Sequence, residues 1–294
     1  FGTVFLTIPA LVAAEPGAVR AELLGDLVEG RRTAAFAVPD RAAAFDPAAV
    51  TVTATGSGAL TGEVERVVDG GVADVLLVVA SGSDGIGLYA VDGVDPGVHR
   101  TPLGTLDLTR PQATIRFTDA VGRRVAGPGE TERVLTHALQ AGATLLAAEQ
   151  VGAARHLLDV AVEYAKTRLQ FGRQIGSFQA VKHKLADMLV DLEHARSVAY
   201  HAAWALTDGT DDPAVATSIA QAVCSAAFSR IARDTIQVLG GIGFTWEHEA
   251  HLYFKRASTD AALLGTAEQH RTRVAELVLD TASADHVPRV ATGR

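Results

Sequence analysis

The stretch RLQFGRQIGSFQAVKHKLADM, Arg168–Met188, joins two long helical patterns and decides how the rest of the chain is interpreted. The pattern before it runs over Thr131–Arg168 and the pattern after it over Phe178–Leu206, both with apolar residues at helical spacing. A second stretch, IQVLGGIGFTWEHEAHLYFKRA, covers Ile236–Ala257 and contains paired glycines where a helix should stop. Both stretches are far stronger evidence for a particular class of protein than the amino-acid composition is.

Working outward, the C-terminal half is predicted to be helical as far as Ala282. Asp211 or Asp212 before Pro213 is a plausible N-cap, and Gly240-Gly241 a plausible stop. Antiparallel helices of this length with short connections predict a four-helix bundle. The four expected segments are Thr131–Arg168, Phe178–Leu206, Pro213–Leu239 and Ala267–Thr281.

The N-terminal half predicts two further parts, which makes the fold class α+β. Residues 1–32 are expected to be the last helices of an N-terminal helical domain, and residues 33–128 an antiparallel β domain of short runs broken by Gly, Asp and Pro. The segment AGPGETE, 126–132, is expected to be a linker into a helical bundle over 129–282. Residues 283–294 are predicted to be a flexible tail.

Composition excludes several classes of function. The net charge of −8 gives no electrostatic reason to bind nucleic acid. The only cysteine, Cys224, lies in the apolar pattern AQAVCSAAF and is expected to be a small buried hydrophobe. Because one cysteine allows no intrachain disulfide and no apolar run predicts a membrane span, we expect a cytoplasmic protein. The start at Phe1, with no basic leader, predicts that sequence is missing before it.

Together with the order helices, β domain and helical bundle, the two quoted stretches make the chain resemble the acyl-CoA dehydrogenase family of flavoproteins. They match its R-x-x-FG-x-x-I-x-x-FQ and Q-x-x-GG-x-G patterns. The resemblance implies FAD as cofactor, an acyl-CoA as substrate, and an oligomer in which these residues reach a neighbouring subunit's FAD. The cofactor-binding residues that it implies are Arg168, Gln170, Phe171, Gln237, Gly240, Gly241 and Thr266.

Physical chemistry agrees with that assignment, because a pyrophosphate suits a fixed guanidinium and backbone N–H groups that glycine leaves accessible. The alternatives are structural. The glycines can be ordinary helix ends, and Phe171 and Phe178 can be core residues. Arg168 can be a solvated residue paired with Asp187 or Glu163.

The family reaction needs a carboxylate at the carbon next to the thioester, and this chain lacks one at both usual positions. Leu264 stands directly before Gly265-Thr266, where most members have glutamate, and Gly142 stands at the other position. Glu149 is a weak candidate, because it lies two helical turns beyond Gly142, about 10 Å of rise. Asp260 and Glu268 are expected to cap helix ends or to be solvated.

The residues expected beside the flavin ring also differ from the family pattern, and they too have lost functional groups. A Thr-Glu-Pro run is replaced by Ala37-Val38-Pro39-Asp40, and a Trp-Ile-Thr-Asn turn by Arg66-Val67-Val68-Asp69. The hydroxyl donor is lost at Val68 and the aromatic cover at Arg66. The retained residues therefore serve the dinucleotide end of the cofactor, and the lost residues serve the ring end.

Three interpretations follow. The first is a non-catalytic subunit, similar to those of actinobacterial heterotetrameric acyl-CoA dehydrogenases, which completes the FAD site of a homologous catalytic partner in an α2β2 assembly. The second is a self-sufficient dehydrogenase that uses another carboxylate such as Glu149. The third is a scaffold without flavin. A bulky acyl group, from steroid or fatty-acid degradation, is expected from the resemblance.

The remaining chemistry-capable residues receive structural interpretations, and no metal site is expected. His183 and His194 are eleven residues apart on one expected helix, too distant to share a metal. His248 and His270 are expected to be solvated residues at helix ends.

Overall fold

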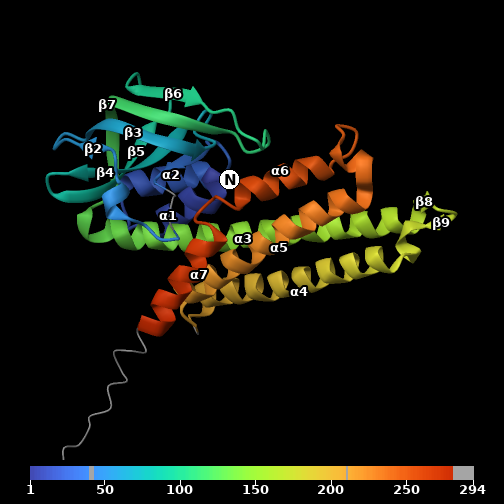
Figure 1. The fold of residues 1–294 in the computed structure, drawn as a ribbon. Coiled ribbons are helices and arrows are strands. Elements are labelled where there is room, and N and C mark those ends of the chain that lie inside the picture. Colours follow the sequence, from blue (N-terminus) through green and yellow to red (C-terminus); the bar gives the residue numbers. More distant parts are fainter. Residues whose placement is uncertain (40–42, 210, 281–294) are drawn as a thin grey trace, which may run out of the picture.

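The computed structural model describes residues 1–39, 43–209 and 211–280, which form a β-sheet part and an elongated helical part (Figure 1). Helix α3, Pro128–Thr167, runs from the sheet to the far end of the helical part, where it meets the short hairpin of β8 and β9 (Figure 1). Two sequence predictions, Asp40 and the tail 283–294, lie outside the described residues.

The N-terminal segment is helical, as the sequence predicted. It consists of a π-helical turn at Gly2–Thr7, α1 at Ile8–Ala13 and α2 at Ala18–Val28. Leu11 and Leu23 are fully buried and belong to one hydrophobic core with strand residues and with the first turns of α3. These helices therefore connect the sheet to the helical part.

The sheet contains seven strands, whose order is β1-β4-β2-β3-β7-β5, with β6 paired to β7. Because β4 also pairs with β5, the strands β4, β2, β3, β7 and β5 form a closed ring around buried side chains such as Leu60, Ile115 and Phe117. The strands are β1 Ala34–Ala37, β2 Thr53–Ala54, β3 Ala59–Val68, β4 Val75–Gly82, β5 Gly85–Asp92, β6 Val98–Pro102 and β7 Gln112–Ala126.

The sheet is mixed, which corrects the prediction of an antiparallel domain. Strand β1 pairs with β4 in parallel over Val75–Val78, and β2 joins the same edge of β4 further along, with Thr53 opposite Ser81. The other pairs are antiparallel. The sequence signal for these parallel pairs is weak, because β1 and β2 are short and their partner follows only after the β3 strand. The six successive buried residues at the start of β4, 75–80, are typical of a strand covered on both faces.

The helical part differs from the sequence prediction at two places. The segment 126–132 is not a linker, because β7 ends at Ala126 and α3 begins at Pro128, a residue suited to a first helical turn. A helix absent from the predicted set, α6, covers Ala250–Asp260. The other elements are β8 Leu169–Gln170, β9 Arg173–Gln174, α4 Gln179–Asp208, α5 Pro213–Leu239, α7 Ala267–Ala275 and a π-helical turn Glu276–Asp280.

Local signals for the ends of α5 are confirmed. The Asp212 carboxylate accepts a hydrogen bond from the Ala214 N–H at 2.8 Å, and α5 ends at Leu239 before Gly240, whose φ is +66°. Helix α5 packs against α3, α4, α6 and α7. Cys224 on α5 is buried, as predicted, and burial raises the pKa of its thiol to about 12.

In the part of the chain that the structure describes, one helix is long and apolar enough to be considered as a membrane span. The segment Pro213–Phe244, α5 and the turn after it, is long and apolar enough by length and composition, and 61% of its most apolar window is buried inside the protein. Such burial is typical of the core helix of a bundle. The absence of a membrane span stays a prediction.

Candidate functional site

The two positions at which the family keeps its base face the same point. A Cβ atom placed on Gly142 would overlap Leu6 Cδ2 and would lie 3.1 Å from the Phe5 carbonyl oxygen and 3.4 Å from Leu264 Cδ1. Leu264 itself is 5% exposed. The point where a carboxylate would be expected is therefore bordered by the Leu6 and Leu264 side chains and the Phe5 carbonyl oxygen, and none of these three is a carboxylate.

The loop that carries Leu264 is held by α7. Leu264 has φ +55° and Gly265 φ +99°, so two successive residues adopt left-handed backbone conformations. His270 Nε2 lies 2.9 Å from the Leu264 carbonyl oxygen, which is an acceptor, so the ring donates from Nε2. Burial lowers the pKa of His270, which favours the neutral ring. The prediction of a solvated His270 was wrong, because the loop folds back over it and leaves it 2% exposed.

Thr266 begins α7 as one half of a capping box. Its side chain accepts from the Gln269 N–H at 3.3 Å, and Gln269 Oε1 accepts from the Thr266 N–H at 2.8 Å. Thr266 and Gln269 therefore satisfy each other's hydrogen-bonding groups at the start of α7. Glu268, in the same first turn, is exposed as expected.

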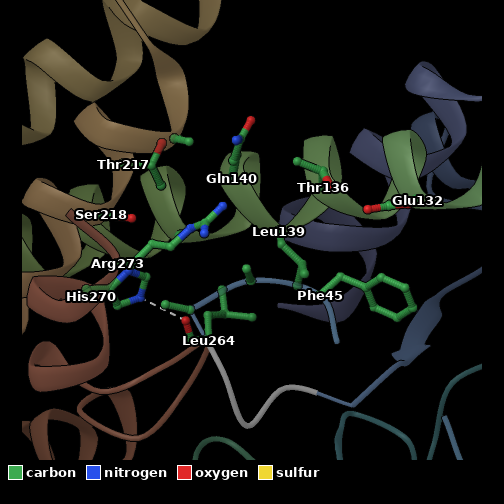
Figure 2. Close-up of a pocket in the computed structure, with 14 residues that line it drawn as sticks. Phe45, Glu132, Thr136, Leu139, Gln140, Thr217, Ser218, Leu264, His270 and Arg273 are labelled. Carbon is green, nitrogen blue, oxygen red and sulfur yellow. Dashed lines mark hydrogen bonds between the residues drawn. The ribbon is translucent and has the colours of Figure 1, made fainter. Parts of the chain in front are cut away.

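A cavity of about 120 Å³ borders Leu264 on the side of α3, α5 and α7 (Figure 2). In Figure 2 the Arg273 side chain extends toward Gln140, and Thr217 and Ser218 of α5 lie on the same side. The cavity can hydrogen-bond a small polar group, and Glu132 supplies the one carboxylate among its described lining residues. The lining is Ala43, Ala44, Phe45, Glu132, Thr136, Leu139, Gln140, Ala143, Ala214, Thr217, Ser218, Leu264, His270 and Arg273.

Glu149, the weak candidate for a base, is engaged by two guanidinium groups. Arg110 Nη2 lies 2.7 and 2.8 Å from its two oxygens, and Arg256 Nη1 lies 2.6 Å from Oε1. Three charge-assisted hydrogen bonds therefore engage both oxygens of Glu149. Its carboxylate is held by the protein's own arginines and is not directed at a substrate.

Asp260 is buried, which corrects the prediction that it caps or solvates a helix end. It is the last residue of α6, its side chain is 0% exposed, and Oδ1 accepts from Arg110 Nη1. Burial raises the pKa of Asp260 to about 7, against the opposing effect of Arg110. Neither Asp260 nor Arg110 carries a local sequence signal, because Arg110 and Asp260 are 150 residues apart and Arg110 and Glu149 are 39 residues apart along the chain.

Two of the predicted cofactor-binding groups lie at the end of the helical part farthest from the sheet (Figure 1). Arg168, Gln170 and Phe171 are exposed at the α3 terminus, and Gln237, Gly240 and Gly241 are exposed at the α5 terminus. Thr266 lies apart from both groups, beside the Leu264 loop. The structure thus separates the predicted residues into an exposed set, here called the bundle tip, and the single residue Thr266.

The bundle tip presents exposed groups, among which the Phe171 ring contacts the Phe178 ring edge-on at 6.2 Å between centroids. Phe171 is 90% exposed with φ +52°, so it is not a core residue. Among the described residues, no salt bridge to Arg168 is found, and Glu163 pairs instead with Lys166 at 2.7 Å. A Cβ atom on Gly240 or Gly241 would meet nothing within 4 Å, so the backbone there is open to an incoming molecule. No group of three or more His, Cys, Asp and Glu residues in the described chain is placed to hold a metal ion.

Residues 132–279 match the family model of the acyl-CoA dehydrogenase C-terminal domain. The chain belongs to the acyl-CoA dehydrogenase family. The acyl-CoA dehydrogenase FadE34 of Mycobacterium tuberculosis is 38% identical over 92% of this chain and 35% of its own length. Two solved structures also match, the ChsE4–ChsE5 complex from Mycobacterium tuberculosis and the Tcur3481–Tcur3483 steroid acyl-CoA dehydrogenase. Their TM-scores are 0.82 and 0.81, their identities 31% and 30%, and the matches cover 94% and 95% of this chain and 74% and 76% of theirs.

The chain spans only part of its curated relatives, with 35% of FadE34 and 64% and 60% of the next two. FAD is the cofactor of the acyl-CoA dehydrogenase family, in agreement with the sequence prediction. The family and its cofactor are therefore established. The residues of this chain can be compared with the two ends of FAD, the flavin ring and the dinucleotide.

The ring end does not fit a flavin. Val38 and Val68 are buried, and together with Leu6, Leu139 and Leu264 they border a space of about 20 Å³, which is room for about one water molecule. Arg66 also lines this space and can donate hydrogen bonds, but the remaining side chains around it are apolar and the space is far too small for a flavin ring. The bundle tip fits the dinucleotide end, because it offers an arginine, an aromatic ring and open glycine backbone.

Proposed function

We propose that this chain is the subunit of a hetero-oligomeric acyl-CoA dehydrogenase that lacks the catalytic base and completes the FAD site of a homologous catalytic partner. The observation that carries this proposal is that Leu264 and Leu6 border the point where a Gly142 side chain would lie, so neither base position supplies a carboxylate. In this assignment the partner supplies the carboxylate and the ring pocket. Bound FAD supplies the hydride acceptor.

The bundle tip supports the proposed role toward the partner. Arg168 would pair with the pyrophosphate, the exposed Phe171 ring would cover an aromatic base, and the open backbone at Gly240 and Gly241 would allow close approach of the phosphates. Among the described residues, Arg168 has no salt bridge and Phe171 contacts Phe178 while staying 90% exposed. Their exposure is compatible with a second subunit that covers them.

The relatives support a two-component assembly and a bulky substrate. One solved relative is a complex of two named chains, ChsE4 and ChsE5, and the other, also a pair of named chains, is described as a steroid acyl-CoA dehydrogenase. We extend both properties to this chain as proposals: an α2β2 assembly with one catalytic and one non-catalytic chain type, and a steroid-derived or similarly bulky acyl-CoA. A cytoplasmic location is proposed with them, because the single cysteine is buried and reduced.

The test is the flavin content of the protein alone and in complex. The chain is purified alone and after coexpression with the homologous subunit encoded beside its gene, and FAD is quantified from its absorbance after denaturation. We expect almost no flavin alone and a yellow complex with one FAD per pair of unlike chains. A homo-oligomer with one FAD per chain and turnover of acyl-CoA would overturn the proposal.

A matched pair of variants tests the bundle tip itself. Arg168→Ala is expected to lower the FAD retained by the complex through gel filtration, while assembly of the two chains is unchanged. Arg155→Ala is the control, because Arg155 is an exposed α3 arginine paired only with Asp159 at 3.0 Å. Equal flavin retention in the two variants would show that the bundle tip does not bind FAD.

The self-sufficient alternative, with Glu149 as base, is opposed by the two arginines that bind Glu149. Glu149→Gln separates the two interpretations, because loss of turnover with retained flavin in the isolated chain would support the alternative. The scaffold alternative is tested by the same flavin measurement, since no flavin in any complex would favour it.

A further inference from the structure

Five charged side chains form a continuous chain of ion pairs between the sheet and the helices. In order, they are Asp107, Arg256, Glu149, Arg110 and Asp260, and each arginine binds the two carboxylates beside it. Asp107 and Arg110 come from the segment between β6 and β7, Glu149 from α3, and Arg256 and Asp260 from α6. The cluster therefore ties α6 and α3 to the β-sheet part at one place.

The cluster is largely removed from water. The exposed fractions of the side chains are 2% for Asp107, 4% for Arg110 and 0% for Asp260, against 23% for Glu149 and 21% for Arg256. With every group ionised, three carboxylates face two guanidinium groups, which leaves one net negative charge. A buried, uncompensated charge is costly, so one carboxyl group in the cluster favours a proton.

Hydrogen bonding identifies which carboxyl group holds that proton. Asp107 accepts bonds on both oxygens, from the Thr109 N–H and hydroxyl on Oδ1 and from Arg256 on Oδ2. Glu149 accepts three bonds from the two arginines. Asp260 accepts one bond, on Oδ1, and its buried Oδ2 has no partner among the described residues. Asp260 is therefore the carboxylate least stabilised by hydrogen bonds, and it is the group in the cluster that takes up a proton most readily.

We propose that this cluster is a proton-sensitive latch. A proton on Asp260 makes the cluster electrically neutral and closes α6 onto the segment before β7, and loss of the proton loosens that contact. The charged groups that face Asp260 are Arg110 and Asp107 from the β6–β7 segment, Glu149 from α3 and Arg256 from α6. The two arginines favour the ionised carboxylate, whereas burial and the two other carboxylates favour the protonated form.

The direction of the pH effect follows from linkage. Burial raises the pKa of Asp260 from 3.8 to about 7 in the closed state, so the closed state binds more protons than an open state with a solvated Asp260. Opening therefore increases with pH between these two values, by up to about tenfold per pH unit, and levels off above the higher one. The contribution of Asp260 to the latch is therefore largest at the acidic end of this range and is lost as the pH rises to about 7.

Hydrogen–deuterium exchange of the full chain between pH 5 and 8 tests the latch, with protection factors corrected for intrinsic exchange. Peptides covering 103–111 and 250–263 are expected to lose about tenfold protection per pH unit up to about pH 7 and then to level off. Asp260→Asn, which mimics the neutral group, is expected to give a flat profile. Asp234→Asn is the matched control, because Asp234 pairs with Lys184 at 2.7 Å outside the cluster, and its profile is expected to follow the wild type.

A direct measurement covers the case in which Asp260→Asn does not fold. Carboxyl ¹³C NMR of the wild-type protein labelled at aspartate yields the titration midpoint of Asp260. Glu149→Gln is expected to shift this midpoint to lower pH, because it removes one repelling charge. An Asp260 midpoint below about pH 5, near the reference value for aspartate, would overturn the latch. Parallel profiles of Asp260→Asn and wild type in the exchange experiment would do the same.

Discussion

Replacing Arg110 by methionine is expected to destabilise the protein far more than loss of an ordinary surface ion pair. Arg110 is 4% exposed and donates to Asp260 through Nη1 and to both Glu149 oxygens through Nη2. Removing one partner of a buried ion pair costs about 3–5 kcal/mol. Glu149 keeps Arg256, and Asp260 can take up a proton, so we expect the lower end, about 3 kcal/mol at pH 7.

The free energy of unfolding is measured by urea titration, followed by far-UV circular dichroism and by fluorescence of Trp204 and Trp246. The control is Arg230→Met, since Arg230 is 57% exposed in its pair with Asp191 and exposed pairs contribute about 0–1 kcal/mol. A midpoint shift at constant m-value identifies a change in stability.

The loss is expected to depend on pH and on Asp260. Without Arg110, the pKa of Asp260 rises further, so the difference between Arg110→Met and wild type grows as pH increases above about 7. Adding Asp260→Asn to Arg110→Met should restore about 1 kcal/mol or more, because it removes the carboxylate left unpaired. A loss below about 1 kcal/mol, equal to that of Arg230→Met, would refute the reasoning.

Two substitutions and one chemical modification test the local structure of the helical part. Thr266→Ala is expected to cost about 1 kcal/mol of unfolding free energy by removing the capping box of α7, as measured by urea titration. Gly240→Ala is expected to cost about 1–3 kcal/mol, because Gly240 has φ +66° and ψ −140° and a Cβ meets no other atom; Gly241→Ala, with no positive φ, is the control and should change stability by less than about 0.5 kcal/mol. Cys224, 1% exposed with its pKa raised to about 12 by burial, is expected to resist iodoacetamide at pH 8 in the folded protein and to react in urea, as mass spectrometry would show.

Helices and their ends were predictable because their causes are local. The Asp212 cap, the stop at Gly240 and the long helical patterns on either side of Arg168–Met188 depend on residues a few positions apart. The short helix α6 was not in the predicted set, because its first residues follow the turn signals of GGIG and its polar face breaks the apolar pattern. The parallel pairing of β1 with β4 was also missed, since it joins strands some forty residues apart.

The candidate site divides in the same way. The sequence alone determined the family, through two spaced motifs, and the absence of a carboxylate at Leu264 and Gly142. The tertiary structure decided that these two positions meet in a hydrophobic contact, that His270 lies under the loop, and that Glu149 and Asp260 share Arg110. Burial and ion pairing depend on groups from distant elements that come together only when the sheet and the helices pack. The residues next to them in the sequence therefore do not predict them.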